Sequence, residues 1–406
     1  MMKRRAAEKT SRPTIALLIE SSSAFGRELQ RGILAYVRER DVWSIQLPDN
    51  EPGFEHLATF SSSKPDGCIA RIVDRRMAGK LKSLHIPVVD VAGGRDLSIG
   101  CWVATNHTRI VQLGIDHFLR RGFRRVAFCG DARFAWSNLR QKLFREMAGE
   151  HGLEVHLYRS VGRSRNPPPW KRISASLQDW VQSLPKPIGI LTSHDLRGQQ
   201  LLDACRATDV AVPEQVAVLG IDNDEMACNL SKPRMSSIVP NAFRSGYVAA
   251  QLLDDMLGRR LKKPIGIEID PERIERRQST DILVFEDQIV RDAMQIIRRH
   301  ACDGLKVVDV VRRMRVSRRT LDAHFVDALG RTPHDELLRL RLDRVKELLL
   351  ETSLSVASVA RRAGFEREEY MNVAFKRTFG VTPGTYRRNR GGGAGLFEKQ
   401  ADRRSL

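Results

Sequence analysis

Residues 354–380 read LSVASVARRAGFEREEYMNVAFKRTFG, and this stretch decides the fold of the C-terminal part of the chain. Apolar residues recur at helical spacing on both sides of Gly364, and glycine suits a tight turn between two helices. The pattern predicts a helix-turn-helix, the arrangement that lets a second helix enter the major groove of DNA. The side chains that we expect to anchor it are Val356, Val359, Ala360, Tyr370 and Phe375.

A segment of the same design comes earlier, at residues 305–330, and reads LKVVDVVRRMRVSRRTLDAHFVDALG. Its pattern predicts one helix, a turn at Arg315 and Val316, and a second helix that Ser317 caps. The side chains expected to face its core are Val307, Val308, Val311, Met314, Leu321 and Phe325.

Residues 334–350 join the two segments and predict a connecting helix of about 17 residues, roughly 25 Å long. That length is comparable with the ~34 Å of one DNA turn, so two recognition helices could enter successive major grooves on one face. One such segment alone would fit a plain helical bundle better than a DNA-binding domain. Two segments at this spacing favour DNA binding.

The composition agrees with a polyanionic partner. The chain has 406 residues, with 68 Lys and Arg against 49 Asp and Glu, a formal net charge of +19. This excess extends over both halves of the chain, so it points to nucleic acid only in general terms. With 42% hydrophobic residues, the chain can form packed cores in two or three domains.

Membrane insertion and a disulfide framework are not expected. The apolar run at residues 14–19 is far shorter than the roughly 20 residues of a spanning helix, and no signal peptide follows from it. The six cysteines are scattered without a C-x-x-C pair, which favours reduced thiols, no cysteine-based metal site and a cytoplasmic location.

Residues 14–270 alternate between short apolar runs and longer stretches of helical period. The runs TIALLI, PVVDVA, RRVAFCG, IGILTS and VAVLGI predict strands, with amphipathic helices between them. This alternation predicts an α/β domain with parallel sheets covered by helices on both faces, followed by the all-α domain. Ligands of such sheets bind at the carboxyl ends of the strands, so polar residues directly after each run are candidate ligand contacts.

The all-α part, from about residue 290 to 388, resembles the AraC/XylS family of transcription regulators. ARRAGF at 360–365 and FKRTFGVTPGTYRR at 375–388 carry the resemblance. It implies that the first recognition helix reads bases and that the second contacts bases or backbone. The DNA-binding candidates are Ser317, Arg318, Arg319, Asp322, His324, Arg367 and Asn372.

The basic and acidic side chains of this part have different expected roles. Arg318 and Arg319 suit guanine or phosphate, because a guanidinium offers paired donors. Another four arginines are equally compatible with phosphate contacts and with solvated charges. Three glutamates depart from the family pattern, and they repel phosphate unless one accepts from a cytosine amino group. The arginines are Arg312, Arg313, Arg315 and Arg361, and the glutamates are Glu366, Glu368 and Glu369.

Residues 13–270 resemble the periplasmic-binding-protein-like sensor of LacI-type repressors. Six pieces stand in order: RELQRGILAYVRER, IDHFLRRGFRRVAFCG, WSNLRQKLF, LTSHD, VPEQVAVLGIDND and PRMSSIVPN. With the DNA-binding part at the C-terminus, the domain order resembles the family of xylose operon regulators. That resemblance implies a homodimer that binds a sugar between two lobes, binds double-stranded operator DNA and activates transcription with RNA polymerase, without a cofactor or metal.

A sugar needs bidentate polar groups for its hydroxyls and an aromatic face for its C–H surface. The resemblance places polar contacts at Asn106, Arg140, His194 and Asp222, with Ser22 after the first strand. Trp136 and Phe25 are stacking candidates, and core packing is an equal alternative for Trp136. Asn106 replaces the usual Asp, and His194 replaces the common Asn and is expected to add pH sensitivity. Both departures weaken the inference that the sugar is xylose.

The predicted organisation is a sensor at 13–275, a linker at 276–286, a double helix-turn-helix at 287–390 and a disordered tail at 391–406. We expect the lobes to close about crossings near Arg121, Val239 and the end of the sheet. Asp195 is expected to cap the helix that follows it.

Two alternatives to a sugar-responsive regulator follow from the same residues. One is an enzyme tethered to DNA by the helical part, which the sequence disfavours because Cys129 lies in an apolar run and Cys228 lacks a neighbouring His. The other is a DNA-binding regulator that responds to a ligand other than a pentose, or to none.

Overall fold

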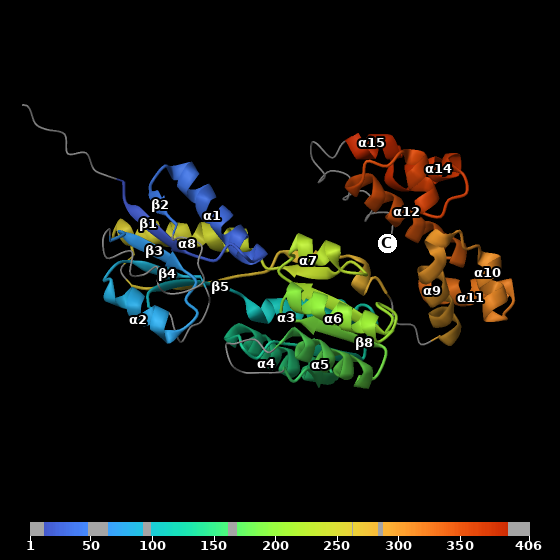
Figure 1. Cartoon of the computed structure of the whole chain (residues 1–406), viewed down its shortest axis with the longest axis horizontal. Helices are drawn as coiled ribbons and strands as arrows, with labels where there is room; N and C mark the ends of the chain where they lie inside the picture. The colour runs from blue at the N-terminus through green and yellow to red at the C-terminus, as the bar shows by residue number, and fades with distance from the viewer. Residues whose placement is uncertain are drawn as a thin grey trace, which may run out of the picture. The chain divides into compact units, whose positions relative to one another are not determined.

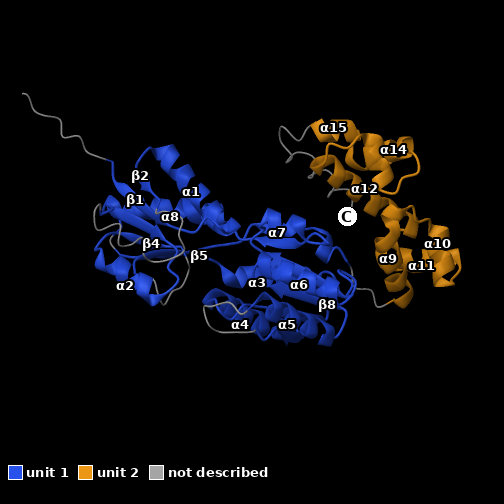
Figure 2. Ribbon diagram, viewed as in Figure 1, with its two compact units in different colours: residues 1–283 blue, residues 284–406 orange. Residues whose placement is uncertain are grey.

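The computed structural model of the chain describes residues 12–47, 64–91, 99–160, 169–261, 263–282 and 287–388 (Figure 1). The chain divides into two compact units, residues 1–283 and 284–406 (Figure 2). The tail predicted at 391–406 lies outside the described residues.

Unit 1 is an α/β unit in which strands and helices alternate. Its strands are β1 (Thr14–Leu18), β2 (Ser44–Gln46), β3 (Gly67–Ala70), β4 (Val88–Asp90), β5 (Cys101–Thr105), β6 (Arg125–Cys129), β7 (Glu154–Leu157), β8 (Ile188–Thr192), β9 (Val216–Ile221), β10 (Ser236–Val239), β11 (Gly266–Ile269) and β12 (Arg273–Glu275). Its helices are α1 (Ala24–Arg40), α2 (Arg75–Ser83), α3 (His107–Leu119), α4 (Ala135–Glu150), α5 (Trp170–Ser183), α6 (Asp195–Ala207), α7 (Glu225–Leu230), α8 (Ala242–Leu257) and the short 3-10 helix η2 (Gln278–Thr280).

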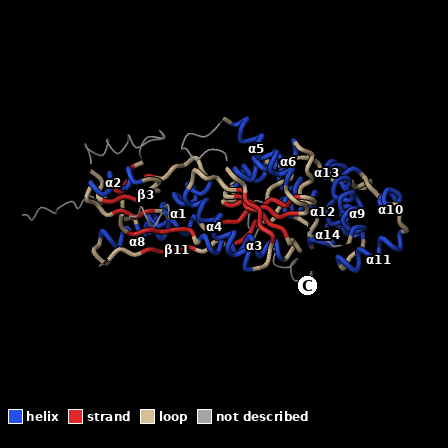
Figure 3. Tube along the Cα trace, turned by 90° about the horizontal axis from the view of Figure 1, so that it is seen from below, coloured by secondary structure: helices blue, strands red, loops and turns tan. Residues whose placement is uncertain are grey.

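The strands form two six-stranded sheets, one in each of two lobes. The first lobe has the order β11-β5-β4-β3-β1-β2, and all its pairs are parallel. The second lobe has the order β12-β10-β9-β8-β6-β7, in which β12 alone runs antiparallel to its neighbour. Helices α5 and α6 lie on one side of the second sheet and α3 on the other (Figure 3). The predicted two-lobed α/β architecture is confirmed.

The chain passes between the lobes at three places. It crosses from β5 to α3 at Asn106, from β10 to α8, and from β11 to β12. Backbone bonds tie these crossings together, because Asn106 donates to the Ile269 carbonyl (2.9 Å) and Glu272 to the Val239 carbonyl (2.9 Å). The expected crossing near Val239 is therefore present.

The prediction that the chain crosses between the lobes near Arg121 is wrong. Arg121 follows α3 inside the second lobe, where its Nε donates to the Thr280 carbonyl oxygen at 2.7 Å. The chain has already changed lobes before α3, since β5 pairs within the first sheet and α3 packs against α4.

The start of the predicted linker is built into unit 1. Ser279 and Thr280 are fully buried, and the Ser279 hydroxyl donates to the Val218 carbonyl at 2.6 Å. The Arg277 amide donates to the Ser236 hydroxyl at 2.8 Å. These bonds hold the segment after β12 on the second sheet.

Helices α1 and α8 approach each other at backbone distance in the first lobe. A Cβ atom on Gly32 would lie 1.9 Å from the Phe243 carbonyl oxygen, and one on Gly246 would lie 2.0 Å from the Leu29 carbonyl oxygen. Only glycine allows this packing, which covers the sheet with a core that includes Ile15, Ile33 and Leu253.

Unit 2 is all-α, as predicted, and contains two helix-turn-helix segments. Ser317 caps α11 through the Thr320 amide (3.0 Å), and Leu321 and Phe325 are buried as expected. The connecting helix α12 extends one residue beyond each predicted end. The helices are α9 (Gln288–His300), η3 (Ala301–Asp303), α10 (Val307–Met314), α11 (Arg318–Leu329), α12 (Pro333–Glu351), α13 (Val356–Arg362), α14 (Glu368–Phe379) and α15 (Pro383–Arg388).

Two expected core positions in unit 2 are wrong. Val308 is 52% exposed while Val310 is fully buried, and Tyr370 is 48% exposed while Met371 is fully buried. In each case the helix presents a neighbouring position to its partner, because the face that is buried depends on the angle at which the helices pack.

Replacing Gly246 with Ala should destabilise unit 1 by about 1–3 kcal/mol, since the added methyl group meets the Leu29 carbonyl. The matched control is Gly79→Ala on α2, where a Cβ has nothing within 4 Å and the change should stabilise by up to about 1 kcal/mol. Urea unfolding followed by circular dichroism measures both. Equal midpoints for the two variants would contradict the close approach of α1 and α8.

Candidate ligand site and DNA interface

The carboxyl ends of strands in both lobes bring polar and aromatic side chains together. Arg140, on α4, is the central group: it is only 5% exposed. Its Nε donates to His107 Nδ1 (3.1 Å), and its Nη1 donates to the Ser193 carbonyl (2.6 Å). Burial lowers the pKa of Arg140 to about 10, opposed chiefly by the negative charge of Asp222. The guanidinium therefore remains charged at neutral pH and is held in one position.

Asp222 follows β9 and lies near this guanidinium. Its backbone has φ +111°, and its amide donates to the Ile238 carbonyl at 3.0 Å. Burial raises the pKa of Asp222 to about 6, although Arg140 and Arg71 lower it. The Asp222 carboxylate is therefore incompletely compensated, as expected for a group that accepts bonds from a ligand.

An aromatic wall stands beside Arg140. Trp136 stacks on Phe134 with centroids 5.1 Å apart, and the Arg140 guanidinium lies 5.1 Å from the Trp136 centroid. His194 meets the Trp136 ring edge-on at 5.7 Å. Trp136 thus contributes to positioning Arg140, and Phe134, which is 37% exposed, extends the wall.

The expected pH sensitivity of His194 is wrong. Burial lowers the pKa of His194 to about 4, and the positive charge of Arg197 lowers it further. The imidazole therefore stays neutral at physiological pH. Its Nδ1 lies 3.0 Å from the Ser193 hydroxyl, which fixes the ring.

The first lobe contributes a second charged pair. Arg71, directly after β3, forms an ion pair with Glu20, and its guanidinium lies 5.5 Å from the Phe25 ring centroid. Arg71 and Glu20 both influence the pKa of Asp222, so charges from the two lobes face each other. The predicted contact Ser22 is exposed, and its carbonyl accepts from Arg27 Nη1 at 3.0 Å.

Asn106 is placed at a lobe crossing, where its side chain already has two partners. Its Oδ1 accepts from the Arg109 amide (3.1 Å) and caps α3, and its Nδ2 donates to Asp270 Oδ1 (2.9 Å). This side chain joins two of the three crossings.

Asp195 does not cap its own helix as expected. Its carboxylate accepts from the Ser237 hydroxyl and from the Asp224 amide, both at 2.6 Å. A Cβ on Gly220 would lie 2.1 Å from Asp195 Oδ1, so the Asp195 carboxylate fits against β9 only because position 220 is glycine. Asp195 therefore ties α6 to β10 and to the loop after β9.

Sequence reasoning missed a buried network behind the aromatic wall. Asp131 is 1% exposed and accepts from Arg133 Nη2 (2.6 Å) and Arg197 Nη2 (2.8 Å). Asp131 directly follows the apolar run of β6, and Arg71 directly follows β3. The strand-end rule would have found Asp131, which follows the predicted run RRVAFCG, whereas the strand before Arg71 is not among the predicted runs.

The N-terminal turn of α11 presents the main DNA-binding candidates. Arg318 and Arg319 are exposed, and Arg318 Nε lies 3.5 Å from Asp322 Oδ2. His324 Nδ1 instead forms a hydrogen bond with the Asp287 carboxylate, which also caps α9 through the Ile289 amide. The His324 side chain is thus engaged within unit 2.

The second recognition helix, α14, carries Arg367 at its N-cap position and Asn372 one turn later. Glu368 and Glu369 lie in its first turn, where carboxylates favour the positive end of the helix dipole. Glu366 precedes the helix and pairs with Lys306 Nζ at 2.7 Å. These contacts account for the acidic residues by interactions within unit 2.

The two helix-turn-helix segments are locked together. Gly364 has φ +80°, and a Cβ there would lie 2.7 Å from the Ala301 carbonyl oxygen. Arg341 on α12 donates to the Ala301 (2.8 Å) and Leu305 (2.6 Å) carbonyls and lies over the Phe365 ring. Packing therefore sets the spacing of α11 and α14.

Two family descriptions match the chain. A periplasmic binding protein-like domain matches residues 115–280, and a helix-turn-helix domain matches residues 310–389. In the described residues, every helix is too short or too polar to cross a bilayer.

Full-length relatives share both parts. The xylose operon regulatory protein of Escherichia coli strain K12 is 30% identical over 386 residues, covering 93% of this chain and 97% of that protein. The xylose operon regulatory protein of Haemophilus influenzae is 30% identical over 384 residues, covering 92% and 98%.

Solved structures agree. The structure of the xylose-binding transcription activator xylR has a TM-score of 0.77 at 29% identity, covering 93% of this chain and 98% of that one. A periplasmic binding protein/LacI transcriptional regulator from Alkaliphilus metalliredigens, solved with D-xylulofuranose, has a TM-score of 0.55 at 19% identity. It covers 66% of this chain and 98% of its own, and shows the fold alone.

Asp222→Asn should stabilise the unliganded protein near neutral pH. The pKa of Asp222 is higher in the folded protein than in the unfolded chain. Ionisation of Asp222 therefore lowers the unfolding free energy as the pH rises from about 4 through about 6. We expect a gain of about 1–3 kcal/mol at about pH 7.5 that shrinks towards zero near pH 4, measured by urea unfolding. Asp203→Asn, at a surface carboxylate on α6, is the control. A less stable Asp222→Asn protein at neutral pH would contradict the assignment of an uncompensated carboxylate.

Proposed function

The chain belongs to the family of xylose operon regulatory proteins and is a DNA-binding transcription regulator, not an enzyme, and we propose that a sugar bound between its lobes controls it. The observation that carries this proposal is the cluster of Arg140, Asp222 and Arg71 beside the wall of Phe134 and Trp136. A guanidinium and a carboxylate offer paired donors and acceptors for vicinal hydroxyls. The wall offers an apolar surface for the C–H face of the ring.

D-Xylose is the first candidate effector, since the relatives over the full length are xylose operon regulators. The side chains of His194 and Asn106 form hydrogen bonds within the protein, and both residues differ from those usual in the family. The polar groups around the ligand therefore differ as well, so related pentoses are the next candidates. In this proposal Asn106 acts at the crossing, and the residues that contact the sugar are Ser22, Phe25, Arg71, Phe134, Trp136, Arg140, His194 and Asp222.

The proposed assembly is a cytoplasmic homodimer on double-stranded operator DNA. The sugar-bound form recruits or contacts RNA polymerase and activates genes of sugar catabolism. Ser317, Arg318, Arg319, Asp322, Arg367 and Asn372 face DNA, and the engagement of His324 with Asp287 makes its role indirect.

Closure of the lobes is the proposed response to sugar. The three crossings join the lobes at adjacent backbone segments, as in hinged two-lobed proteins. Arg27 of the first lobe and Asp224 of the second already approach to 3.7 Å between Nη2 and Oδ2. A ligand that bridges Arg71 and Asp222 would favour the closed arrangement by its contacts to both lobes.

A sugar screen tests the effector. D-Xylose at about one hundred times its Kd should raise the unfolding free energy by about 2.7 kcal/mol, because it binds only the native state. Calorimetric titration and thermal shift of the full chain measure this for xylose and related pentoses. Asp222→Asn should abolish the response, and Glu154→Gln, at the opposite end of the second sheet, should retain it. If no sugar shifts the melting temperature of the wild type, the sensor proposal fails and a ligand-independent regulator is favoured.

Arg319→Ala tests the recognition helix. If Arg319 reads a base, the variant should bind a selected operator about 1–3 kcal/mol more weakly and discriminate less against scrambled DNA. Fluorescence anisotropy at fixed salt concentration measures both affinities. Equal losses on both duplexes would reassign Arg319 to phosphate, and unchanged binding would remove it from the interface.

A further inference from the structure

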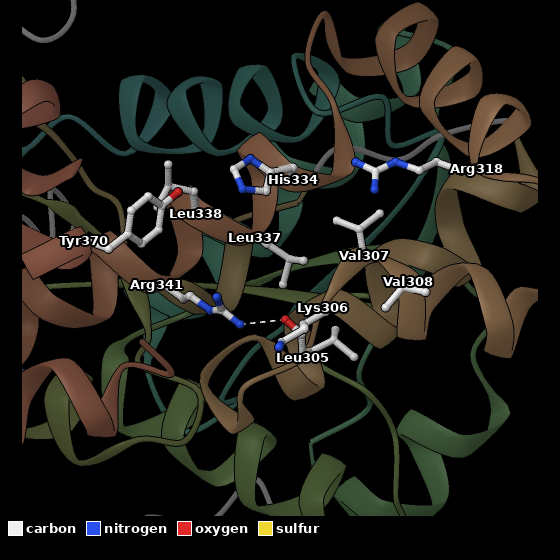
Figure 4. Close-up of a pocket in the computed structure, with 10 residues that line it drawn as sticks. All are labelled: Leu305, Lys306, Val307, Val308, Arg318, His334, Leu337, Leu338, Arg341 and Tyr370. Carbon is white, nitrogen blue, oxygen red and sulfur yellow. Dashed lines mark hydrogen bonds between the residues drawn. The ribbon is translucent and has the colours of Figure 1, made fainter. Parts of the chain in front are cut away.

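A pocket of about 340 Å³ opens on unit 2 between the two helix-turn-helix segments (Figure 4). Four of the side chains around it carry basic nitrogen groups, and Tyr370 adds an exposed phenol. None of the described residues that line it is acidic. The basic groups belong to Lys306, Arg318, His334 and Arg341.

The pocket lies at the N-terminal ends of both recognition helices. Arg318 is the first residue of α11, and Tyr370 is the third residue of α14. His334 is the second residue of α12, and Lys306 immediately precedes α10. Side chains from the starts of four helices therefore line one pocket.

The geometry of DNA indicates which part of the duplex such a pocket would contact. When two recognition helices enter successive major grooves from one side, the sugar-phosphate backbone between the grooves runs past the protein surface between those helices. N-terminal residues of recognition helices are the ones that approach DNA most closely. A hollow bounded by Arg318 and Tyr370 is therefore positioned over the backbone.

We propose that this pocket binds a phosphodiester of the DNA strand that runs between the two major grooves. The inference rests on the DNA-binding function and names a contact site within it. Lys306, Arg318 and His334 supply donors for the phosphate oxygens. The apolar side chains of Val308 and Leu338 face the adjoining deoxyribose.

Arg341 and Lys306 have different partners in the protein without DNA. Arg341 donates to the Ala301 and Leu305 carbonyls, so it builds the pocket floor and contributes its charge. Figure 4 shows its bond to Leu305. Lys306 pairs with Glu366, but both side chains are exposed, at 61% and 70%. An exposed pair of this kind contributes little stability, so a phosphate can take Lys306 from Glu366.

The competition between Glu366 and the phosphate for Lys306 gives a test in which two substitutions have opposite expected effects on DNA affinity. Lys306→Gln removes the cation, and Glu366→Gln removes the same ion pair but leaves the cation available. Lys306→Gln should weaken binding roughly tenfold on a duplex selected from a random library and on its scrambled version alike. It should also reduce the slope of log K against log salt concentration by about 0.9. Glu366→Gln should bind both duplexes at least as tightly as the wild type.

Fluorescence anisotropy with the full chain, over a series of salt concentrations, measures these affinities. Arg299→Gln, an exposed cation on α9 outside the pocket, is the charge-matched control and should change the slope far less. Equal weakening by Lys306→Gln and Glu366→Gln would show that the pair only joins the two segments, and it would overturn the proposal. So would an unchanged salt slope in Lys306→Gln. A wild-type chain that binds neither duplex would instead refute DNA binding itself.

Discussion

The buried guanidinium of Arg140 is the group on which the sensor site depends. A permanent charge that is 5% exposed is stable only where fixed acceptors replace water. His107 Nδ1 at the start of α3 and the Ser193 carbonyl after β8 accept from the guanidinium, and the negative charge of Asp222 after β9 also favours the cation. One side chain of α4 thereby joins the start of α3 to the end of β8, and the site is organised before a ligand arrives.

A comparable constraint operates in unit 2 at Gly364. The turn of the second helix-turn-helix touches the backbone at Ala301, and Arg341 bonds to that same carbonyl from the connecting helix. The second turn and the connecting helix are thereby tied to the segment that precedes the first helix-turn-helix. The packing of the two helix-turn-helix segments thus sets the distance between the recognition helices that reaching two major grooves requires. The length of α12 determines only roughly how large that distance is.

Apolar periodicity and turn residues were sufficient to predict both helix-turn-helix segments and the strands β1, β4, β6, β8 and β9. The strand runs, the cap at Ser317 and the two helix-turn-helix segments needed only local information. The family resemblance predicted Asp222 and His194, which directly follow predicted strand runs, where ligands of parallel sheets bind. Errors arose where a partner decides the outcome: Met371 rather than Tyr370 is buried because α14 packs at an angle that its own sequence does not specify.

The sequence by itself determined the class of each domain, their order and the strand ends that carry polar groups. Only the tertiary structure decided which partner each polar group takes. Asn106 bonds to Asp270 across 164 positions, and His324 pairs with Asp287 instead of pointing freely from its helix. Such partners follow from strand order and lobe crossings, because hydrogen bonds act over about 3 Å and folding alone brings distant residues that close.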